Sequence, residues 1–384
     1  MVKKNPIKKK ILIIASSFIT IETFLEEFLA ELSKKYDVSV ATNLNEFNNN
    51  YLNFKNKYNY RLIHIPIRRR INFYFDFLTL ISLFLIIKKN KFDLTLSLTP
   101  KAGLLTSISS YLNFIKIRIH IFNGQIWYNK KGFIRILLKY LDKITFFLSN
   151  YCLCESKSQI EFLFLEGFQS KKINVIAEGS LMGVDTSKFT KNDKIRIKLR
   201  DELNIKNNQK VCMYLGRLNY EKGLKLIVDA SNYFEKYEDV LFILVGSSEI
   251  NSIDLFKLFN LKKNIIYIGY KNKIENYLNI CDFTVLPSYR EGFGISVIEA
   301  ASMEKPCLIS NIHGIRDTVI NNYSGLKFDI GNFNDFITKL EYMFKNLKKT
   351  RLMGKRARSM VKKKFEKKIV IDSYIKFIDN ISNL

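Results

Sequence analysis

The chain has 384 residues, of which 47% are hydrophobic and 26% are charged. This balance is typical of a globular protein and excludes an intrinsically disordered chain, and the length allows two ordinary domains. The formal net charge of +26 indicates an anionic partner, such as nucleic acid, a membrane surface or a polyanionic substrate. It could equally reflect compositional drift, because Lys, Asn, Ile and Phe are heavily used throughout the chain.

The five cysteines show no paired framework and no zinc-ligand spacing with the three histidines (His64, His120 and His313). This pattern predicts a reduced, cytosolic protein, because disulfides form in oxidising compartments. The cysteines are Cys152, Cys154, Cys212, Cys281 and Cys307.

The lysine-rich start of the chain superficially resembles a secretion signal. However, the apolar run Ile11–Ser17 is short and has no convincing cleavage site. We therefore favour a first buried strand at Ile11–Ala15, followed by a loop at Ser16–Thr20.

The first half of the chain alternates apolar strand patterns with helical ones, which predicts a parallel, doubly wound sheet. Further strands are expected at 38–41, 61–66, 94–98, 117–122, 151–154 and 174–177. Helices are expected at 21–35, 73–87, after 99–103, at 132–148 and at 159–165. Segment 73–87 is too short for a membrane span, so it is interpreted as a helix buried on the sheet or as an interfacial helix. Segment 132–148 is an amphipathic basic helix that suits a domain surface or a membrane face.

The polar stretch 185–208 interrupts this alternation, and we place the domain boundary there. A second α/β unit follows, with strands at 211–215, 241–245, 265–268, 283–286 and 306–310 and helices at 224–237, 274–280, 295–303 and within 332–384. The predicted fold class is α/β, with two doubly wound Rossmann-like domains facing a central cleft. The expected domains are 1–190 and 191–365, and a C-terminal helix at 366–384 is expected to return to the first domain.

The segment Tyr289–Ala300 lies between a predicted strand and a predicted helix. Its glycines, Gly292 and Gly294, expose backbone N–H groups at a helix N-terminus, which is a favourable site for phosphate. Glu291 and Glu299 would be repelled by a phosphate, so we interpret them as acceptors for sugar hydroxyls on either side of a diphosphate.

A second loop, Leu215–Gly223, follows the first strand of the second domain. Gly216 permits a tight turn at the carboxyl end of that strand, where open sheets bind ligands. Arg217 and Lys222 offer a planar fork and a mobile point charge that match a diphosphate, although a solvated basic loop would look similar.

Two further strand ends carry glycines. Val245–Ser248 would line the same crevice, and Gly269 with Tyr270 could frame a nucleobase through backbone groups. A glycine at the end of a strand is often only a turn, so each signal is weak alone.

Together these motifs resemble the donor half of the retaining glycosyltransferases of family 4, which have a GT-B fold. The resemblance lies in Gly216-Arg217, Lys222-Gly223, Ile268–Tyr270, Pro287–Gly294 and the pair Glu291 and Glu299. The first half resembles a subgroup that builds bacterial surface glycans on lipid carriers, through Thr99–Gly103, His120, Gly124–Trp127 and Gly179–Asp185 with Phe189.

The resemblance implies a role for each matching residue. Arg217 and Lys222 would neutralise the donor diphosphate, Glu299 would accept hydrogen bonds from the ribose, and Glu291 would lie beside the donor sugar. The catalytic candidates are Glu291, Lys222 and Arg217. The expected nucleotide-sugar site comprises Gly216, Arg217, Lys222, Gly269, Tyr270, Glu291, Gly292, Phe293, Gly294 and Glu299. The expected acceptor side comprises Lys101, Asn123, Gly124 and Gln125. Neither a metal nor a cofactor is expected.

The chain departs from the family pattern at two positions. Asn123 stands where many relatives carry a histidine, and it cannot act as a general base near pH 7. His120 is interpreted as a core residue and His313 as a cleft-lining or plain loop residue, so no base is assigned, and the departing phosphate could take the proton. Ser16-Ser17 replace the usual glycine-rich turn, which leaves the positioning of the acceptor open.

The expected function is transfer of a sugar, a hexose or an N-acetylhexosamine, from a UDP-linked donor to a lipid-linked glycan in capsule or O-antigen synthesis. The expected location is cytoplasmic, peripheral at the inner face of the plasma membrane and in contact with its anionic surface. One alternative is a nucleotide-sugar epimerase of the same fold. Another is a basic nucleic-acid-binding or membrane-binding protein, but the sequence has no nucleic-acid-binding motif, so nucleic acid is not an expected partner.

Overall fold

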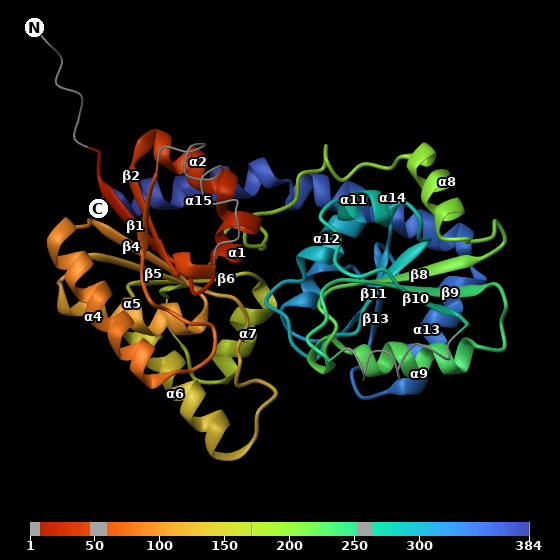
Figure 1. Ribbon diagram of the computed structural model, residues 1–384, viewed down its shortest axis with the longest axis horizontal. Helices are drawn as coiled ribbons and strands as arrows, with labels where there is room; N and C mark the ends of the chain where they lie inside the picture. The colour runs from red at the N-terminus through yellow and green to blue at the C-terminus, as the bar shows by residue number, and fades with distance from the viewer. Residues whose placement is uncertain (1–7, 47–59, 170, 252–262, 384) are drawn as a thin grey trace, which may run out of the picture. The chain divides into compact units, whose positions relative to one another are not determined.

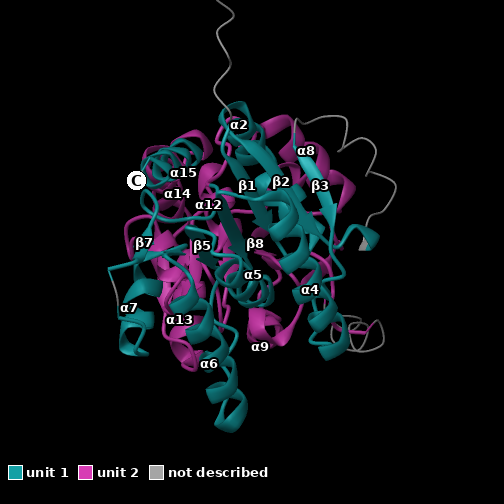
Figure 2. Ribbon diagram, turned by 90° about the vertical axis from the view of Figure 1, so that its left-hand side faces the viewer, with its two compact units in different colours: residues 1–182, 371–384 teal, residues 183–370 magenta. Residues whose placement is uncertain are grey.

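The computed structural model describes residues 8–46, 60–169, 171–251 and 263–383, so the first seven residues of the signal-like start lie outside it. The chain divides into two compact units (Figure 2). Unit 1 comprises residues 1–182 and 371–384, and unit 2 comprises residues 183–370. Each unit contains one parallel sheet, as the alternating strand and helix patterns predicted.

The sheet of unit 1 has seven strands in the order β3-β2-β1-β4-β5-β6-β7 (Figure 1). The strands are β1 (Lys10–Ile14), β2 (Asp37–Thr42), β3 (Arg61–His64), β4 (Leu94–Leu98), β5 (Ile117–Phe122), β6 (Tyr151–Cys154) and β7 (Ile173–Val175). The helices are α1 (Phe18–Thr20), η1 (Ile21–Leu25), α2 (Glu26–Lys35), η2 (Leu44–Glu46), α4 (Phe73–Asn90), α5 (Pro100–Leu112), α6 (Gly132–Leu148) and α7 (Lys157–Leu165). The strand order reverses between β1 and β4, where ligands usually bind in open sheets.

His120 lies in the middle of β5 and is a core residue, as its apolar surroundings predicted. Its Nδ1 lies 3.0 Å from Ser97 Oγ, and its ring packs edge-on against Phe122. Burial lowers the pKa of His120 to about 3, so the ring stays neutral. Gly103 lies in α5, the helix that follows the neighbouring strand β4. A side chain at this position would overlap the His120 ring, which explains the glycine.

The sheet of unit 2 has six strands in the order β10-β9-β8-β11-β12-β13. The strands are β8 (Lys210–Leu215), β9 (Val240–Val245), β10 (Ile265–Tyr267), β11 (Phe283–Leu286), β12 (Cys307–Ser310) and β13 (Gly325–Phe328). The helices are α8 (Asp193–Glu202), η3 (Tyr220–Lys222), α9 (Leu224–Phe234), α11 (Ile274–Leu278), α12 (Ile295–Ser302), η4 (Ile315–Thr318), α13 (Phe333–Lys345) and α14 (Leu347–Lys364). The order reverses between β8 and β11, so the two glycine loops of interest follow adjacent strands.

The final helix, α15 (Lys367–Ser382), begins in unit 2 and continues into unit 1. Within unit 1, Asp379 accepts a hydrogen bond from Tyr36 Oη at 2.7 Å and forms an ion pair with Lys35. Unit 2 begins at Gly183, before the polar stretch where we expected the boundary. The reason is that Val184 exchanges backbone hydrogen bonds with Phe365 and Lys367.

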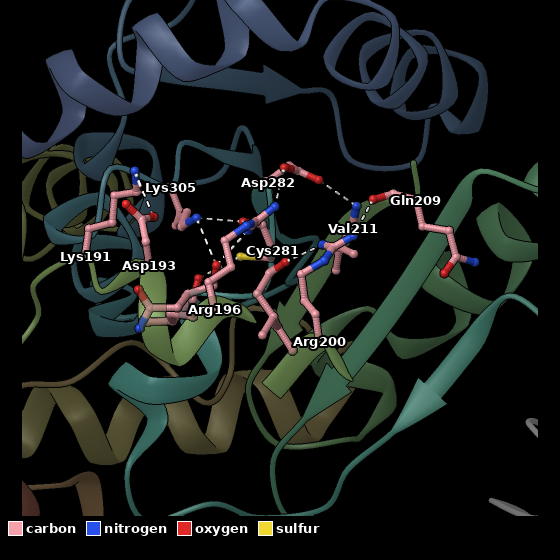
Figure 3. A network of polar contacts seen from close by, with 12 residues as sticks. Lys191, Asp193, Arg196, Arg200, Gln209, Val211, Cys281, Asp282 and Lys305 are labelled. Atoms are coloured by element: carbon pink, nitrogen blue, oxygen red, sulfur yellow. Dashed lines mark hydrogen bonds and ion pairs between the residues drawn. The ribbon is translucent and has the colours of Figure 1, made fainter. Parts of the chain in front are cut away.

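Helix α8 was missed by the sequence pattern, because only three of its ten residues are apolar. It is fixed to the sheet by buried cations instead (Figure 3). Arg200 donates to the carbonyl oxygens of Ile280, Lys206 and Gln209 at 2.8–3.0 Å. Arg196 and Lys305 both donate to the carbonyl oxygens of Asn279, the C-cap residue of α11, and of Cys281. Cations at this end complement the helix dipole.

All five cysteines lie within the described residues, where they are buried and free. Burial raises the pKa of the Cys152 and Cys307 thiols to about 12. These thiols are therefore protonated core side chains.

Replacing Arg200 by leucine is expected to destabilise the fold by about 2–4 kcal/mol, because three buried carbonyls lose their donor. Urea denaturation followed by far-UV circular dichroism measures this loss. Lys198→Leu on the exposed face of the same helix is the matched control and should change stability by about 0.5 kcal/mol at most. Equal losses in both variants would show that the buried cation does not anchor α8.

Candidate functional site

The carboxyl edge of the unit 2 sheet is formed by loops that meet through their backbones. Gly216, after β8, donates to the carbonyl of Val245, and Gly246, after β9, donates to the carbonyl of Gly269 at 3.0 Å. A side chain at Gly246 would overlap the carbonyl oxygen of Gly216, so this close approach requires glycine. The predicted residues Gly216 and Gly269 therefore belong to one continuous edge.

The loop after β8 is fixed against the loop after β11. Gly223 has a φ of +77°, and a side chain there would overlap the carbonyl oxygen of Pro287. The backbone N–H of Tyr289 donates to the Glu221 carbonyl at 2.9 Å. Asn219 caps the turn by accepting from the Lys222 N–H at 2.8 Å. These contacts hold Lys222 beside the Glu291 loop.

Lys222 and Glu291, which are 69 residues apart in sequence, form an ion pair with Nζ 2.5 Å from Oε1. Ser288 Oγ donates to the same oxygen at 2.9 Å, and Ser310 Oγ in turn donates to the Ser288 carbonyl. The two charged side chains are only 18% and 11% exposed, so water screens this pair weakly. Among the described residues these bonds reach Oε1, which leaves Oε2 able to accept a hydroxyl.

The segment after Glu291 forms the N-terminus of α12. Phe293 is buried and packs edge-on against Phe365, and this contact anchors the loop in the core. Gly294 is the N-cap residue with a φ of +89°. Gly314, from the loop after β12, lies so close to the Glu291 and Gly292 carbonyls that a side chain would overlap them. The N–H groups of the first turn of α12 thus begin next to the Lys222–Glu291 pair, where an anion could bind.

Arg217 lies at the same edge, but its guanidinium is paired with Glu249. Asn219 Nδ2 also donates to Glu249, at 2.7 Å to the second oxygen. Each predicted diphosphate cation therefore has a carboxylate partner in this structure. The sequence analysis missed Glu249, although its position in the loop after β9 was a signal that could have identified it.

Glu299 lies half-buried on the second turn of α12. Burial raises its pKa from 4.5 to about 7, and Glu275 adds to this effect, whereas Lys188 and Lys367 oppose it. Tyr270, at the other end of the predicted site, is largely exposed after β10. These two residues share the unit with the Lys222–Glu291 pair, but within the described part of the chain neither is hydrogen-bonded to Lys222 or Glu291.

The carboxyl edge of unit 1 carries a different group of side chains. Asn123 donates through Nδ2 to Glu155, and its Oδ1 accepts from the Thr99 N–H at 3.1 Å. Thr99 has a φ of +71°, and its hydroxyl donates to Ser16 Oγ at 2.9 Å. Glu155 directly follows β6, so the rule that ligand residues follow strands could have identified it. This group gathers four polar side chains from four adjacent strand ends.

The other acceptor-side candidates are not part of this group. Lys101 forms an ion pair with Asp76 at 2.7 Å and donates to the Arg70 carbonyl, which ties α5 to α4. Gln125 is fully buried and accepts from Gln159 at 3.4 Å. Gly124 precedes it with a φ of +84°. Lys101 and Gln125 therefore have structural partners inside unit 1.

Trp127, at the end of the same motif, is also a packing residue. Its Nε1 donates to Asp142 of α6 at 2.7 Å. Burial raises the pKa of Asp142 to about 7, and the bond from Trp127 opposes this shift. His313 is likewise buried, next to Gly314. Among the described residues, no group of three or more His, Cys, Asp or Glu side chains is arranged to hold a metal ion.

Comparisons with known proteins point to similarity with glycosyltransferases. Residues 195–360 match the family model described as "Glycosyl transferases group 1". The capsular polysaccharide biosynthesis glycosyltransferase CapM of Staphylococcus aureus is 29% identical over 82% of this chain and 84% of its own length. The UDP-Gal:alpha-D-GlcNAc-diphosphoundecaprenol alpha-1,3-galactosyltransferase of Escherichia coli is 28% identical over 82% of this chain and 81% of its own length.

Among solved structures, Anabaena HepE in complex with UDP and glucose has a TM-score of 0.79 at 17% identity, covering 98% of this chain and 100% of HepE. The fold is thus that of the GT-B glycosyltransferases, as the resemblance implied. The family match covers most of unit 2, and the likeness in fold extends over both units.

The raised pKa of Glu299 makes a prediction about stability. The folded protein holds a proton on this carboxyl that the unfolded chain releases above its ordinary pKa of 4.5. The charged carboxylate therefore lowers stability as pH rises from about 4.5 to about 7, and the loss is complete above that range. Glu299→Gln should raise the melting temperature at pH 8 and leave it nearly unchanged at pH 4.5.

Scanning calorimetry at the two pH values measures this difference. Glu238→Gln, at an exposed position of the same unit, is the matched control and should show no pH-dependent gain. A gain for Glu299→Gln that is equal at both pH values would contradict the buried, proton-holding carboxyl.

Proposed function

We propose that this protein is a retaining glycosyltransferase of family 4. It would move a hexose or an N-acetylhexosamine from a UDP-linked donor to a lipid-linked glycan in capsule or O-antigen synthesis. The observation that carries this proposal is the Lys222–Glu291 pair, which Ser288 supports and which lies at the glycine-rich start of α12. A relative also supports the proposal, because the Escherichia coli enzyme is named for a UDP-sugar donor and a diphosphoundecaprenol-linked acceptor.

In this proposal, the donor binds to unit 2. The diphosphate accepts hydrogen bonds from the first N–H groups of α12 and lies between Lys222 and Arg217. Glu299 accepts hydrogen bonds from the ribose hydroxyls, and the backbone at Gly269 and Tyr270 frames the base. Glu291 uses its second oxygen, Oε2, to accept a hydroxyl of the donor sugar. The cations and the helix N-terminus supply the charge stabilisation, so we expect turnover without an added metal or cofactor.

The proposed reaction proceeds on one face of the sugar. The acceptor hydroxyl oxygen forms a bond to the anomeric carbon while the bond from that carbon to the diphosphate oxygen breaks. The hydroxyl proton passes to the departing phosphate, and the configuration at the anomeric carbon is retained. Lys222 stabilises the negative charge that grows on the leaving UDP. This route needs no protein base, which agrees with asparagine at position 123.

Unit 1 is the proposed acceptor domain. Asn123 and Glu155, with Thr99 and Ser16, offer amide, carboxylate and hydroxyl groups that suit sugar hydroxyls. Gly124 lies in the same loop as Asn123. Lys101 and Gln125 would stabilise this region through their contacts with Asp76 and Gln159. A lipid-linked acceptor would place the enzyme at the cytoplasmic face of the plasma membrane, in contact with anionic lipid.

Glu291→Gln and Lys222→Ala should each lower kcat by on the order of a hundredfold. Lys222→Ala removes the cation beside the leaving diphosphate, and Glu291→Gln removes the carboxylate that holds Lys222 and would accept the sugar hydroxyl. The double variant should be little worse than either single variant, because the pair acts as a unit. The assay measures UDP release from a panel of UDP-sugars with GlcNAc-diphospho-lipid as acceptor. Proton NMR of the product reports the anomeric configuration.

Lys225→Ala is the matched control for Lys222→Ala, because Lys225 is exposed and pairs with Asp229 on the surface of α9. Wild-type turnover in Glu291→Gln or Lys222→Ala would refute the site. Inverted product would refute retention. An epimerised donor in the absence of acceptor would favour the epimerase alternative.

Glu249→Gln should strengthen UDP binding by about two- to fivefold at low salt. The reason is that the diphosphate would no longer compete with a carboxylate for Arg217, and such exposed pairs contribute up to about 1 kcal/mol. Isothermal titration calorimetry with UDP measures the change. The control is Glu235→Gln, which makes the same charge change at the C-terminal end of α9, away from the Lys222 loop that precedes this helix. It should leave the affinity for UDP unchanged. Weaker binding to Glu249→Gln would show that Glu249 organises Arg217 for the ligand.

A further inference from the structure

Unit 1 exposes large apolar side chains on the N-terminal halves of two helices. On α4, Phe73 is 87% exposed, and Tyr74 and Phe77 are exposed with it. On α6, Phe133 is 76% exposed, and the other large exposed residues of its N-terminal half are Ile134, Ile136, Leu137 and Tyr140. Scattered single apolar residues on a surface are ordinary, but a cluster of this size indicates a binding surface.

Both helices are attached to unit 1 mainly through their C-terminal halves. The buried residues of α4 are Thr79, Leu83 and Ile87, and those of α6 are Asp142, Thr145 and Phe146. The sequence analysis left α4 open between a buried and an interfacial helix, and the structure shows one buried and one exposed face. Among the described residues, no helix is long and apolar enough to cross a bilayer.

The two apolar ends lie on the same side of unit 1. Helix α5 packs against both α4 and α6, and Figure 2 shows it between them. Each of these helices connects parallel strands, so its N-terminus lies at the carboxyl edge of the sheet. That is the edge where Asn123 and Glu155 meet. We call the exposed residues of the two N-terminal halves the α4/α6 surface.

Basic residues precede both helices of the α4/α6 surface. Arg68–Arg70 precede α4, and Lys130 and Lys131 precede α6. From residue 61 to residue 148 the sequence has fifteen Lys and Arg, three Asp and no Glu. The Arg68 guanidinium lies 3.4 Å from the centre of the Phe75 ring, so charge and apolar surface are interleaved.

The few carboxylates near this surface are already compensated. Asp76 is paired with Lys101, and Asp142 is buried against Trp127. Glu166 of the neighbouring loop is held by both Arg135 and Lys139 at 2.5 and 2.6 Å. Asp93 accepts from the backbone N–H of Lys10, at the amino end of β1. The surface therefore offers apolar and aromatic groups inside a rim of positive charge.

We propose that the α4/α6 surface inserts into the headgroup region of an anionic bilayer. Aromatic and aliphatic side chains would enter the boundary with the acyl chains, while the flanking Arg and Lys contact lipid phosphates. A second copy of the chain fits this surface poorly, because pairing it with itself would bring two basic rims together. The proposal goes beyond the proposed function, because it requires apolar insertion by named side chains rather than charge attraction alone.

Flotation with vesicles of phosphatidylcholine containing about 30 mol% phosphatidylglycerol tests the proposal. The α6 variant carries Phe133→Ser, Ile136→Ser and Tyr140→Ser, and the α4 variant carries Phe73→Ser and Phe77→Ser. Each should bind at least about tenfold more weakly than the wild type, because several side chains lose their apolar burial. The control is Phe114→Ser, which removes an 89% exposed aromatic at the opposite end of α5 and should bind within about twofold of the wild type.

Salt separates insertion from simple charge attraction. At about 0.5 M NaCl the wild type should keep part of its vesicle binding, whereas the α6 variant should lose it, because salt screens only the basic rim. Wild-type binding by both serine variants would overturn the proposal. So would a wild type that ignores vesicles but forms a dimer in light scattering that the same substitutions dissociate.

The outcome is independent of the proposed reaction. Vesicle binding is measured without donor or acceptor, so a wild type that floats with vesicles but transfers no sugar would refute the function and leave the docking surface intact. If transfer occurs, the serine variants should keep the wild-type rate on a short-chain, water-soluble acceptor and lose rate on an acceptor in vesicles. A loss on both acceptors, with the circular dichroism unchanged, would place these residues in the catalytic machinery instead and overturn the proposal.

Discussion

The predicted nucleotide-sugar site of unit 2 depends on one close backbone approach, that of Gly223 to Pro287. Because Gly223 has no side chain, the turn after β8 can lie directly against the loop after β11. That contact brings Lys222 next to Glu291, which is 69 residues away in sequence. The loop that carries Glu291 then leads directly into the N-terminus of α12. Any larger residue at position 223 would both adopt an unfavourable φ and push the two loops apart. The charges of the site are therefore a consequence of a steric condition on the backbone.

The site is electrically balanced before any ligand arrives. Lys222 is matched by Glu291, and Arg217 is matched by Glu249. Such pairs keep partly buried cations from being left uncompensated, and an anion that entered this site would have to compete with the two carboxylates for them. Glu299, in contrast, is not fully compensated. Burial raises its pKa to about 7, so the folded protein is less stable when this carboxyl is charged. A fold that tolerates such a carboxyl is typical of a site selected for binding rather than for stability.

Much of this architecture could be predicted from the sequence, and the reasons differ between elements. Strands β5 and β11 begin and end at the predicted residues. β11 is a short, mostly apolar run that is buried along its length, and β5 has an apolar residue at every other position. Helix α8 could not be predicted in this way, because buried arginine bonds rather than an apolar stripe attach it to the sheet. The partners Glu249 and Glu155 were missed because their contacts with Arg217 and Asn123 join loops that are distant in sequence, and their positions after strands were the only signal. The apolar character of α4 was evident, but its division into a buried and an exposed face depends on where α5 lies.

The two units use the same parallel-sheet architecture and place different chemistry at its carboxyl edge. In unit 2 the edge is built of glycine loops, two cations and a helix N-terminus, which are the groups that recognise phosphate. In unit 1 the edge carries the hydroxyls of Ser16 and Thr99 with the Asn123 amide and the Glu155 carboxylate, which are suited to neutral polyols. The basic and apolar groups of unit 1 lie instead on its helices, beside that edge. A single topology thus presents groups suited to anions in one unit and groups suited to hydroxyls in the other, and the division follows from which side chains end each strand.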